Sequence, residues 1–230
     1  MKNPPLILGR LIKRYKRFFA DILLDDGSIV TAHCVNTGSM KGCLETDAMV
    51  GISTSDNPKR KLKYTLEIIK ISGTWVGVNT SLTNRLAEEF IRENGFSEIG
   101  TFKELKREVK YGVNSRIDIL LETETKVCYI EVKNVSMVFN GKASFPDAVS
   151  ERGTKHLLEL IEVVKNGQRG IMLFICQRDD ALSFKPASEI DPVYAKTLQK
   201  AYDAGVEILV YKSKVSVKEN KVYCRIPWSL

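Results

Sequence analysis

The chain has 230 residues, of which 43% are hydrophobic and 27% charged, a profile typical of a folded globular protein with a net charge of +7. No apolar run approaches the ~20 residues that span a bilayer, and the first residues lack the apolar core of a signal peptide, so we expect a cytoplasmic protein with no membrane partner. The five cysteines are odd in number and scattered, and there are only two histidines, which argues against a disulfide framework, a zinc site or a histidine-rich metal centre.

The first third of the chain reads as short β-strands separated by turn signals such as Asp26-Gly27 and Ser72-Gly73. No segment in this part of the chain shows the periodicity of a helix. Six strands at this spacing predict a small barrel, and the five-stranded oligonucleotide-binding (OB) type fits residues 1–82. The predicted strands are Leu6 to Lys13, Phe18 to Leu24, Ile29 to Cys34, Ala48 to Ser53, Leu62 to Ile71 and Trp75 to Val78.

Most of the positive charge lies in this predicted barrel. Residues 1–82 carry 12 Lys and Arg against 7 Asp and Glu, whereas residues 83–230 carry 23 against 21, as expected if the barrel holds a polyanion such as DNA. Phe18 and Phe19 interleave the charges, but we expect them in the barrel core. The candidate DNA-binding residues of the barrel are Arg10, Lys13, Arg14, Arg17, Lys59, Arg60 and Lys61.

Residues 83–230 alternate between helical and strand patterns, which predicts an α/β domain with a mixed sheet covered by helices. The short connection near residues 80–83 predicts that the two parts pack closely. The predicted elements are a helix at Leu82 to Asn94 stopped by Gly95, a strand at Glu108 to Val113, a hairpin, a helix from Pro146-Asp147 to Lys165, a strand at Gly170 to Gln177, a helix from Asp191-Pro192 to before Gly205, and a strand at Val206 to Tyr211.

The hairpin carries the most informative spacing. Two hydrophobic runs within residues 116–135 flank a polar linker. Glu131 and Lys133 lie on one strand and point the same way, because side chains alternate with period two. A turn centred after Glu124 places Asp118 opposite Glu131, with Cβ atoms about 4.5–5.5 Å apart. Two carboxylates at that distance suit one divalent cation, with Lys133 placed to hold a water or an anionic oxygen.

The alternative is that these charges are simply solvated on one face of the sheet. The second run is otherwise apolar or aromatic on both faces, like a buried strand. A buried carboxylate and lysine are costly unless they pair or bind a metal. The pattern therefore favours metal-assisted cleavage of a phosphodiester, although a motif this short also occurs by chance.

The order of elements, with Asp118 and Glu131-x-Lys133 on the central hairpin, resembles the PD-(D/E)xK nuclease superfamily over roughly residues 83–211. It departs in that Ile117, not proline, precedes the aspartate. The resemblance implies Asp118 and Glu131 as ligands of Mg²⁺ (or Mn²⁺) and Lys133 as the residue that polarises water or the scissile phosphate. By analogy it adds two catalytic candidates, Glu89 on the first helix and Gln177 at a strand end.

Longer motifs resemble the sugar fermentation stimulation protein A family across essentially the whole chain. That resemblance implies DNA binding by an N-terminal OB-like barrel and a nuclease-like C-terminal domain, with a regulatory role in sugar metabolism proposed for the family. The motifs are Gly9 to Phe18, Asn36 to Met40, Asn57 to Leu62, Asn114 to Asp118, Cys128 to Val135, Phe145 to Val149 and Glu151 to His156.

The helix that follows the hairpin has a polar face at i, i+3, i+4 spacing, made by Arg152, Lys155, His156 and Glu159. If it faces Asp118, Arg152 and Lys155 would contact DNA phosphates and His156 would assist proton transfer. A solvated face is the alternative.

Two functions remain open on the sequence. The first is an Mg²⁺-dependent nuclease that acts on DNA, with RNA not excluded. The second is a non-catalytic, sequence-tolerant DNA-binding regulator of sugar-metabolism genes that retains a nuclease-like pocket. The two carboxylates favour the first, because near a polyanion they would repel phosphates unless a cation intervenes. The sequence also leaves homo-oligomer formation open.

Overall fold

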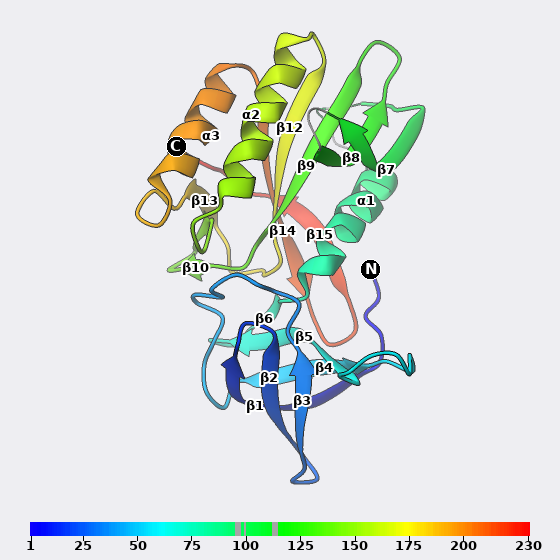
Figure 1. The fold of residues 1–230 in the computed structure, drawn as a ribbon, viewed down its shortest axis with the longest axis vertical. Coiled ribbons are helices and arrows are strands. Elements are labelled where there is room, and N and C mark those ends of the chain that lie inside the picture. The colour runs from blue at the N-terminus through cyan, green and yellow to red at the C-terminus, as the bar shows by residue number, and fades with distance from the viewer. Residues whose placement is uncertain (95–97, 99, 112–114) are drawn as a thin grey trace.

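The computed structural model of the protein describes residues 1–94, 98, 100–111 and 115–230. Its N-terminal part is a barrel in the strand order β3-β2-β1-β4-β5, closed by pairing of β3 with β5, with β6 added beside β5 (Figure 1). The five-stranded barrel predicted from the sequence is confirmed, and each strand end lies within two residues of its expected position. The strands are β1 (Leu6–Tyr15), β2 (Phe19–Leu24), β3 (Ile29–His33), β4 (Met49–Thr54), β5 (Tyr64–Ile71) and β6 (Thr74–Gly77).

The barrel encloses an apolar core in which Ile22, Ile52 and Leu66 are fully buried. Phe18 is 45% exposed, so the expectation that it belongs to this core is wrong. It ends the tight β1–β2 turn, where Lys16 and Arg17 have positive φ, and the turn directs it outward.

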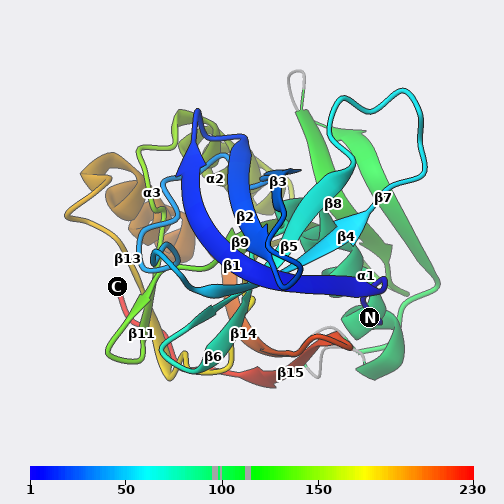
Figure 2. The same ribbon diagram turned by 90° about the horizontal axis from the view of Figure 1, so that it is seen from below.

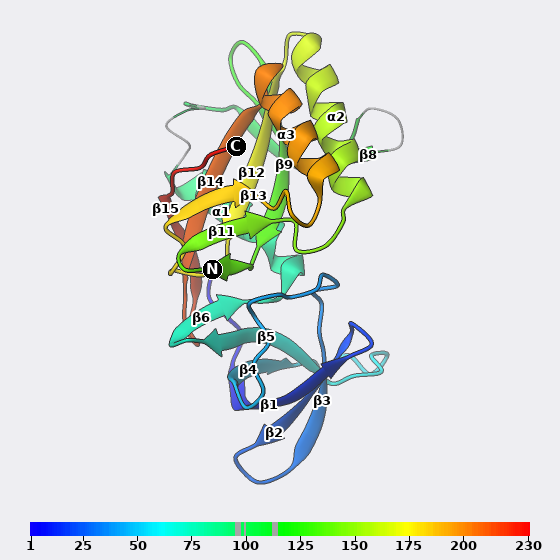
Figure 3. The ribbon, with the colours of Figure 1, turned by 90° about the vertical axis from the view of Figure 1, so that its left-hand side faces the viewer.

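The C-terminal part is a six-stranded mixed sheet in the order β15-β14-β12-β9-β8-β7. β12 runs parallel to both β9 and β14, and the other pairs are antiparallel. One face packs against α1 and the other against α2 and α3, giving two separate apolar cores (Figures 1 and 3). The elements are α1 (Thr83–Asn94), β7 (Glu104–Tyr111), β8 (Ser115–Glu122), β9 (Val127–Val135), α2 (Glu151–Lys165), β12 (Arg169–Cys176), α3 (Pro192–Asp203), β14 (Glu207–Val215) and β15 (Asn220–Arg225).

The predicted α/β class is confirmed, with differences at the edges. β7 starts at Glu104, four residues before the expected position, because its alternating charges suit an exposed edge strand. The stop at Gly95 and the end of the strand predicted to reach Val113 lie outside the described residues. The sequence also missed a 3-10 turn (Thr80–Leu82), a small sheet of β10 (Val138–Phe139), β11 (Lys142–Phe145) and β13 (Ser183–Pro186), and the edge strand β15.

Helix α2 begins at Glu151 and not at Pro146, where the sequence placed its start. Ser150 is the N-cap, and its hydroxyl accepts a hydrogen bond from the Gly153 N–H at 3.1 Å. The preceding loop instead contacts the barrel, because the Asp147 carboxylate accepts the Met40 N–H at 2.8 Å.

The barrel and the sheet pack directly on one another, as the short connection between them predicted (Figures 1 and 3). The Gly77 N–H donates to the Gln177 carbonyl at 2.8 Å, and a Cβ at Gly77 would lie 2.4 Å from Gln177 Oε1. A side chain at position 77 would therefore displace the Gln177 amide from its present place. No helix among the described residues is long and apolar enough to cross a membrane.

Candidate active site

The β8–β9 hairpin has the register that the sequence predicted. Ile119 pairs with Ile130, which makes Asp118 and Glu131 the next facing positions. The backbone pairing of β8 with β9 ends there. The Asp118 side chain supplies the next contact between the two strands, because its Oδ2 accepts a hydrogen bond from the Val132 N–H at 2.8 Å. The two acidic residues thus lie where the central strands separate.

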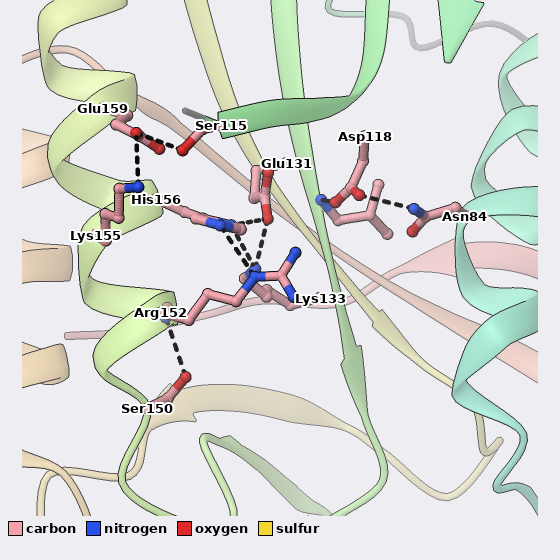
Figure 4. A network of polar contacts seen from close by, with 12 residues as sticks. Asn84, Ser115, Asp118, Glu131, Lys133, Ser150, Arg152, Lys155, His156 and Glu159 are labelled. Carbon is pink, nitrogen blue, oxygen red and sulfur yellow. Dashed lines mark hydrogen bonds and ion pairs between the residues drawn. The ribbon is translucent and has the colours of Figure 1, made fainter. Parts of the chain in front are cut away.

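Asp118 is held from the α1 side of β9, where Asn84 Nδ2 donates to its Oδ1 at 2.7 Å (Figure 4). Burial raises the pKa of Asp118 to about 6, and the negative charge of Glu131 adds to the shift. The hydrogen bonds from Val132 and Asn84 oppose the shift without cancelling it. Without a nearby cation, the carboxyl group therefore holds its proton to an unusually high pH.

Glu131 is held from the α2 side and is 1% exposed. Its Oε1 accepts from Lys133 Nζ at 2.6 Å and contacts His156 Nδ1 (Figure 4). Burial raises the pKa of Glu131, but the hydrogen bond from His156 and the charge of Lys133 outweigh it, so the pKa lies below its usual value. The other oxygen, Oε2, is buried and has no hydrogen-bond partner among the described residues.

His156 links this group to the surface of α2. Arg152 Nε donates to His156 Nε2 at 3.3 Å, which leaves Nδ1 to carry the proton shared with Glu131. Lys133 Nζ lies 3.2 Å from the same Nδ1. The structure therefore turns the polar face of α2 toward Glu131, with His156 buried and Arg152 exposed.

Two further residues of that face continue away from Glu131. Lys155 pairs with Glu159 at 3.7 Å, and its side chain is 51% exposed. Glu159 also accepts from Ser115 Oγ on β8 at 2.5 Å, which ties α2 to the edge of the hairpin.

Glu89 and Gln177 are not brought to this group. Glu89 on α1 pairs with the amino group of Met1 at 2.5 Å. Gln177 lies under the barrel, where its Nε2 donates to Asn134 Oδ1 at 2.6 Å. Asn84, which the sequence reasoning did not single out, supplies the α1 contact instead. It lies at the start of the predicted helix, on which the resemblance pointed to a carboxylate, Glu89, and not to an amide.

The predicted DNA-binding residues of the barrel are mostly exposed. Arg10 is in reach of Asp47 at 3.5 Å, and Lys13 of Asp21 at 3.8 Å. Arg17, Lys59, Arg60 and Lys61 are exposed, and Arg60 also donates to Thr65.

Arg14 differs from these residues. Its Nη2 donates to the carbonyl oxygens of Arg17, Asn36 and Gly38 at 2.8–3.0 Å, which fixes the loop that follows β3. The β1–β2 turn and the β4–β5 connection project on the side of the molecule where α2 lies (Figures 2 and 3).

Within residues 1–94, 98, 100–111 and 115–230, no group of three or more His, Cys, Asp or Glu side chains is placed to hold a metal ion. The Asp118–Glu131 pair is therefore a two-carboxylate candidate. That is the number Mg²⁺ takes from a protein when waters and substrate phosphates complete its octahedron.

Comparisons with known proteins agree on one family. The model of the SfsA N-terminal OB domain matches residues 12–78, and that of the sugar fermentation stimulation protein RE domain matches residues 81–219. Sugar fermentation stimulation protein homologs from Geobacter sulfurreducens and Maricaulis maris are 51% and 53% identical, over 97% and 94% of this chain and 96% and 93% of theirs.

A solved structure, that of Pyrococcus furiosus SfsA in complex with Ca²⁺, aligns with a TM-score of 0.90 and 25% identity. The alignment covers 100% of this chain and 98% of the other, so both the barrel and the sheet are shared. Identity near one half over almost the full length, together with both domain models, establishes the relationship. The chain belongs to the sugar fermentation stimulation protein A (SfsA) family.

Proposed function

We propose that this protein is a divalent-cation-dependent nuclease that cleaves DNA in the cytoplasm, with Asp118 and Glu131 as ligands of Mg²⁺ or Mn²⁺ and Lys133 as the residue that binds the attacked phosphate or water. The observation that carries the proposal is the pair of buried carboxyl groups on adjacent central strands. Burial and the charge of Glu131 together raise the pKa of Asp118 to about 6. Two carboxylates so placed repel one another when both are ionised, and a bound cation would compensate that repulsion.

The residues present fit such a cation. Glu131 Oε2 is buried and has no hydrogen-bond partner among the described residues, which leaves a ligand atom available. Asp118 and Glu131 now take their hydrogen bonds from opposite sides of β9 (Figure 4). In the cation-bound protein we expect one of the two carboxylates to turn from its present partner, which the broad terminal torsions of Asp and Glu permit. The Ca²⁺ in the Pyrococcus relative supports a divalent ion.

When bound, Mg²⁺ or Mn²⁺ would supply an acidic water and charge for the phosphoryl oxygens. The protein's own groups do the positioning. The backbone of Val132 and the amide of Asn84 hold Asp118, while His156 orients Glu131. Lys133 Nζ, now 2.6 Å from Glu131, would donate a hydrogen bond to a phosphate oxygen or water beside it.

The surroundings of the site suit a polyanionic substrate. Arg152 is exposed on α2 next to His156, and Lys155 is exposed further along the same helix. The β1–β2 turn and the β4–β5 connection, which carry exposed Lys and Arg, lie on the same side of the molecule (Figure 3). We propose that DNA runs from these barrel loops across α2, with its phosphates paired to Lys and Arg.

The test is cleavage by the full-length protein with Mg²⁺ or Mn²⁺ on single-stranded, duplex and branched DNA, and on RNA. We expect nicking that Lys133→Ala abolishes while DNA binding is kept. The matched control is Lys221→Ala on β15, whose side chain is 55% exposed and pairs with Glu93. Its cleavage should equal that of the unaltered protein.

Absence of cleavage on every substrate, with binding retained, would overturn the nuclease proposal. The non-catalytic DNA-binding regulator would then be the function to pursue. Cleavage of RNA alone would keep the chemistry and change the substrate.

A further inference from the structure

A cavity lies beside the candidate active site, between α2 and the hairpin side of the sheet. It has a volume of about 420 Å³, within the range of small-molecule pockets. Its lining includes Tyr111 from β7, Tyr129 from β9, Glu159 and Glu162 from α2, and Asn166 and Gln168 from the turn that follows α2. None of these residues has a part in the nuclease chemistry proposed above.

The cavity lies along the same strand, β9, as Glu131. Tyr129, Glu131 and Lys133 lie on one face of β9 at period two, so Tyr129 is about 6–7 Å along the strand from Glu131. On α2, Glu159 lies one turn beyond His156, next to Ser115 (Figure 4). A nucleotide next to a phosphate at Asp118 and Glu131 would therefore lie at the mouth of this cavity.

Its chemistry suits a flat, neutral ligand with hydrogen-bond donors. The rings of Tyr111 and Tyr129 are 5.7 Å apart and tilted by 41°, which gives two aromatic walls. The Glu159 carboxylate is held in the lining by Tyr111 and Ser115. The Val127 N–H fixes the amide of Gln168 at 2.8 Å. A carboxylate there disfavours a phosphate and accepts from the amino group of a base.

The phenol of Tyr111 stays neutral. Burial raises the pKa of Tyr111 far above its usual value, and the charges of Glu131 and Glu159 add to that shift. The two carboxylates of the lining, Glu159 and Glu162, are each paired with an exposed lysine of α2, Lys155 at 3.7 Å and Lys165 at 2.8 Å. The lining thus combines an aromatic face with carboxylates and amides, groups that recognise bases better than phosphates.

We propose that this cavity receives one unpaired nucleobase of the nucleic acid bound at Asp118 and Glu131, so that the preferred substrate is DNA with an extruded or single-stranded nucleotide. The inference rests on the proposed function for the position of the strand. It adds the substrate class, which the carboxylates alone do not determine. Stacking on the tyrosines supplies affinity, and Glu159 favours bases with an exocyclic amino group.

The experiment compares the affinity of the full-length protein, without divalent cation, for two DNA duplexes. One carries a single bulged cytidine, and in the other the bulged nucleotide lacks its base. Fluorescence anisotropy should show about tenfold tighter binding of the base-bearing duplex, the size expected for one stacked base. Tyr111→Leu should remove this difference, and Tyr111→Phe, which keeps the ring, should retain most of it.

A second variant guards against misfolding of Tyr111→Leu. The unaltered protein should bind a bulged cytidine more tightly than a bulged thymidine, and Glu159→Gln should reduce that preference. Equal affinity of the unaltered protein for the base-bearing and base-free duplexes would overturn the pocket proposal. Tighter binding of the base-bearing duplex without metal-dependent cleavage would overturn the nuclease proposal and keep the pocket proposal. Metal-dependent cleavage with equal affinity for the two duplexes would overturn the pocket proposal and keep the nuclease proposal.

Discussion

The charged residues of the barrel and those of the central sheet differ in how far their side chains are exposed to solvent. The side chains of Lys13 and Arg10 on the barrel are 64% and 50% exposed. Those of Lys133 and Glu131 in the sheet are 13% and 2% exposed. An exposed ion pair contributes at most about 1 kcal/mol to stability and is screened by salt. A buried charge destabilises the fold strongly when its partner is removed. The barrel charges should therefore act additively, and the sheet charges as one unit.

The largest effect should come from removing one member of that unit. Glu131→Ala leaves Lys133 and His156 without their shared acceptor, and we expect the free energy of unfolding to fall by about 3 kcal/mol. Relief of the repulsion on Asp118 offsets part of the loss. Urea denaturation of the metal-free protein measures the change in the free energy of unfolding.

The control is Glu162→Ala on α2, which removes an exposed pair with Lys165. Its effect should stay within about 0.5 kcal/mol. Equal stabilities of the two variants would mean that the sheet charges are solvated, and the contrast between the regions would fail.

A pH dependence should follow from Asp118, whose pKa is raised to about 6. Between about pH 4 and 6 the folded state holds a proton that the unfolded state has lost, so stability should fall as pH rises through this window, by at most about 3 kcal/mol. Glu131 acts in the opposite sense, because its pKa is lowered and its contribution disappears only as pH falls through that lowered value.

Asp118→Asn should flatten the stability profile between pH 4 and 6 in thermal unfolding scans, whereas Asp203→Asn, an exposed site on α3, should leave it unchanged. Mn²⁺ should stabilise the unaltered protein above pH 6 and less at pH 5, because the ion competes with the proton on Asp118. A profile of Asp118→Asn that keeps its slope would assign the titration to another group.

The sequence predicted correctly those features of the site that depend only on residues close in sequence. The alternation along 116–135 and the length of its linker determine the register that brings Asp118 opposite Glu131, and the structure reproduces it. The period of α2 likewise predicted the face on which Arg152 and His156 lie. These features follow from backbone geometry within one or two elements.

Predictions by analogy had no such basis. Glu89 and Gln177 were chosen from element order alone, and their surroundings depend on segments distant in sequence. The amino group of Met1, far earlier in the sequence, pairs with Glu89, and the barrel residue Gly77 packs against Gln177. A side chain's partner across a domain junction is not encoded in the local spacing.

The smallest effect per residue should come from the barrel. Replacing Lys13, Arg17, Lys59 and Lys61 together by Gln should weaken DNA binding and reduce the slope of log affinity against log salt, by up to about 0.9 for each lost duplex phosphate contact. Each single replacement should change stability by less than about 0.5 kcal/mol. Affinity measured from low to moderate salt gives the slope.

Arg14 is left out of that set because its guanidinium binds three carbonyl oxygens of its own chain. Arg14→Gln should lower stability more than any of the four and confound the binding result. If the fourfold variant keeps its salt slope, the barrel loops do not contact phosphates. The backbone would then have to be held by α2, where Arg152→Gln and Lys155→Gln would carry the loss instead.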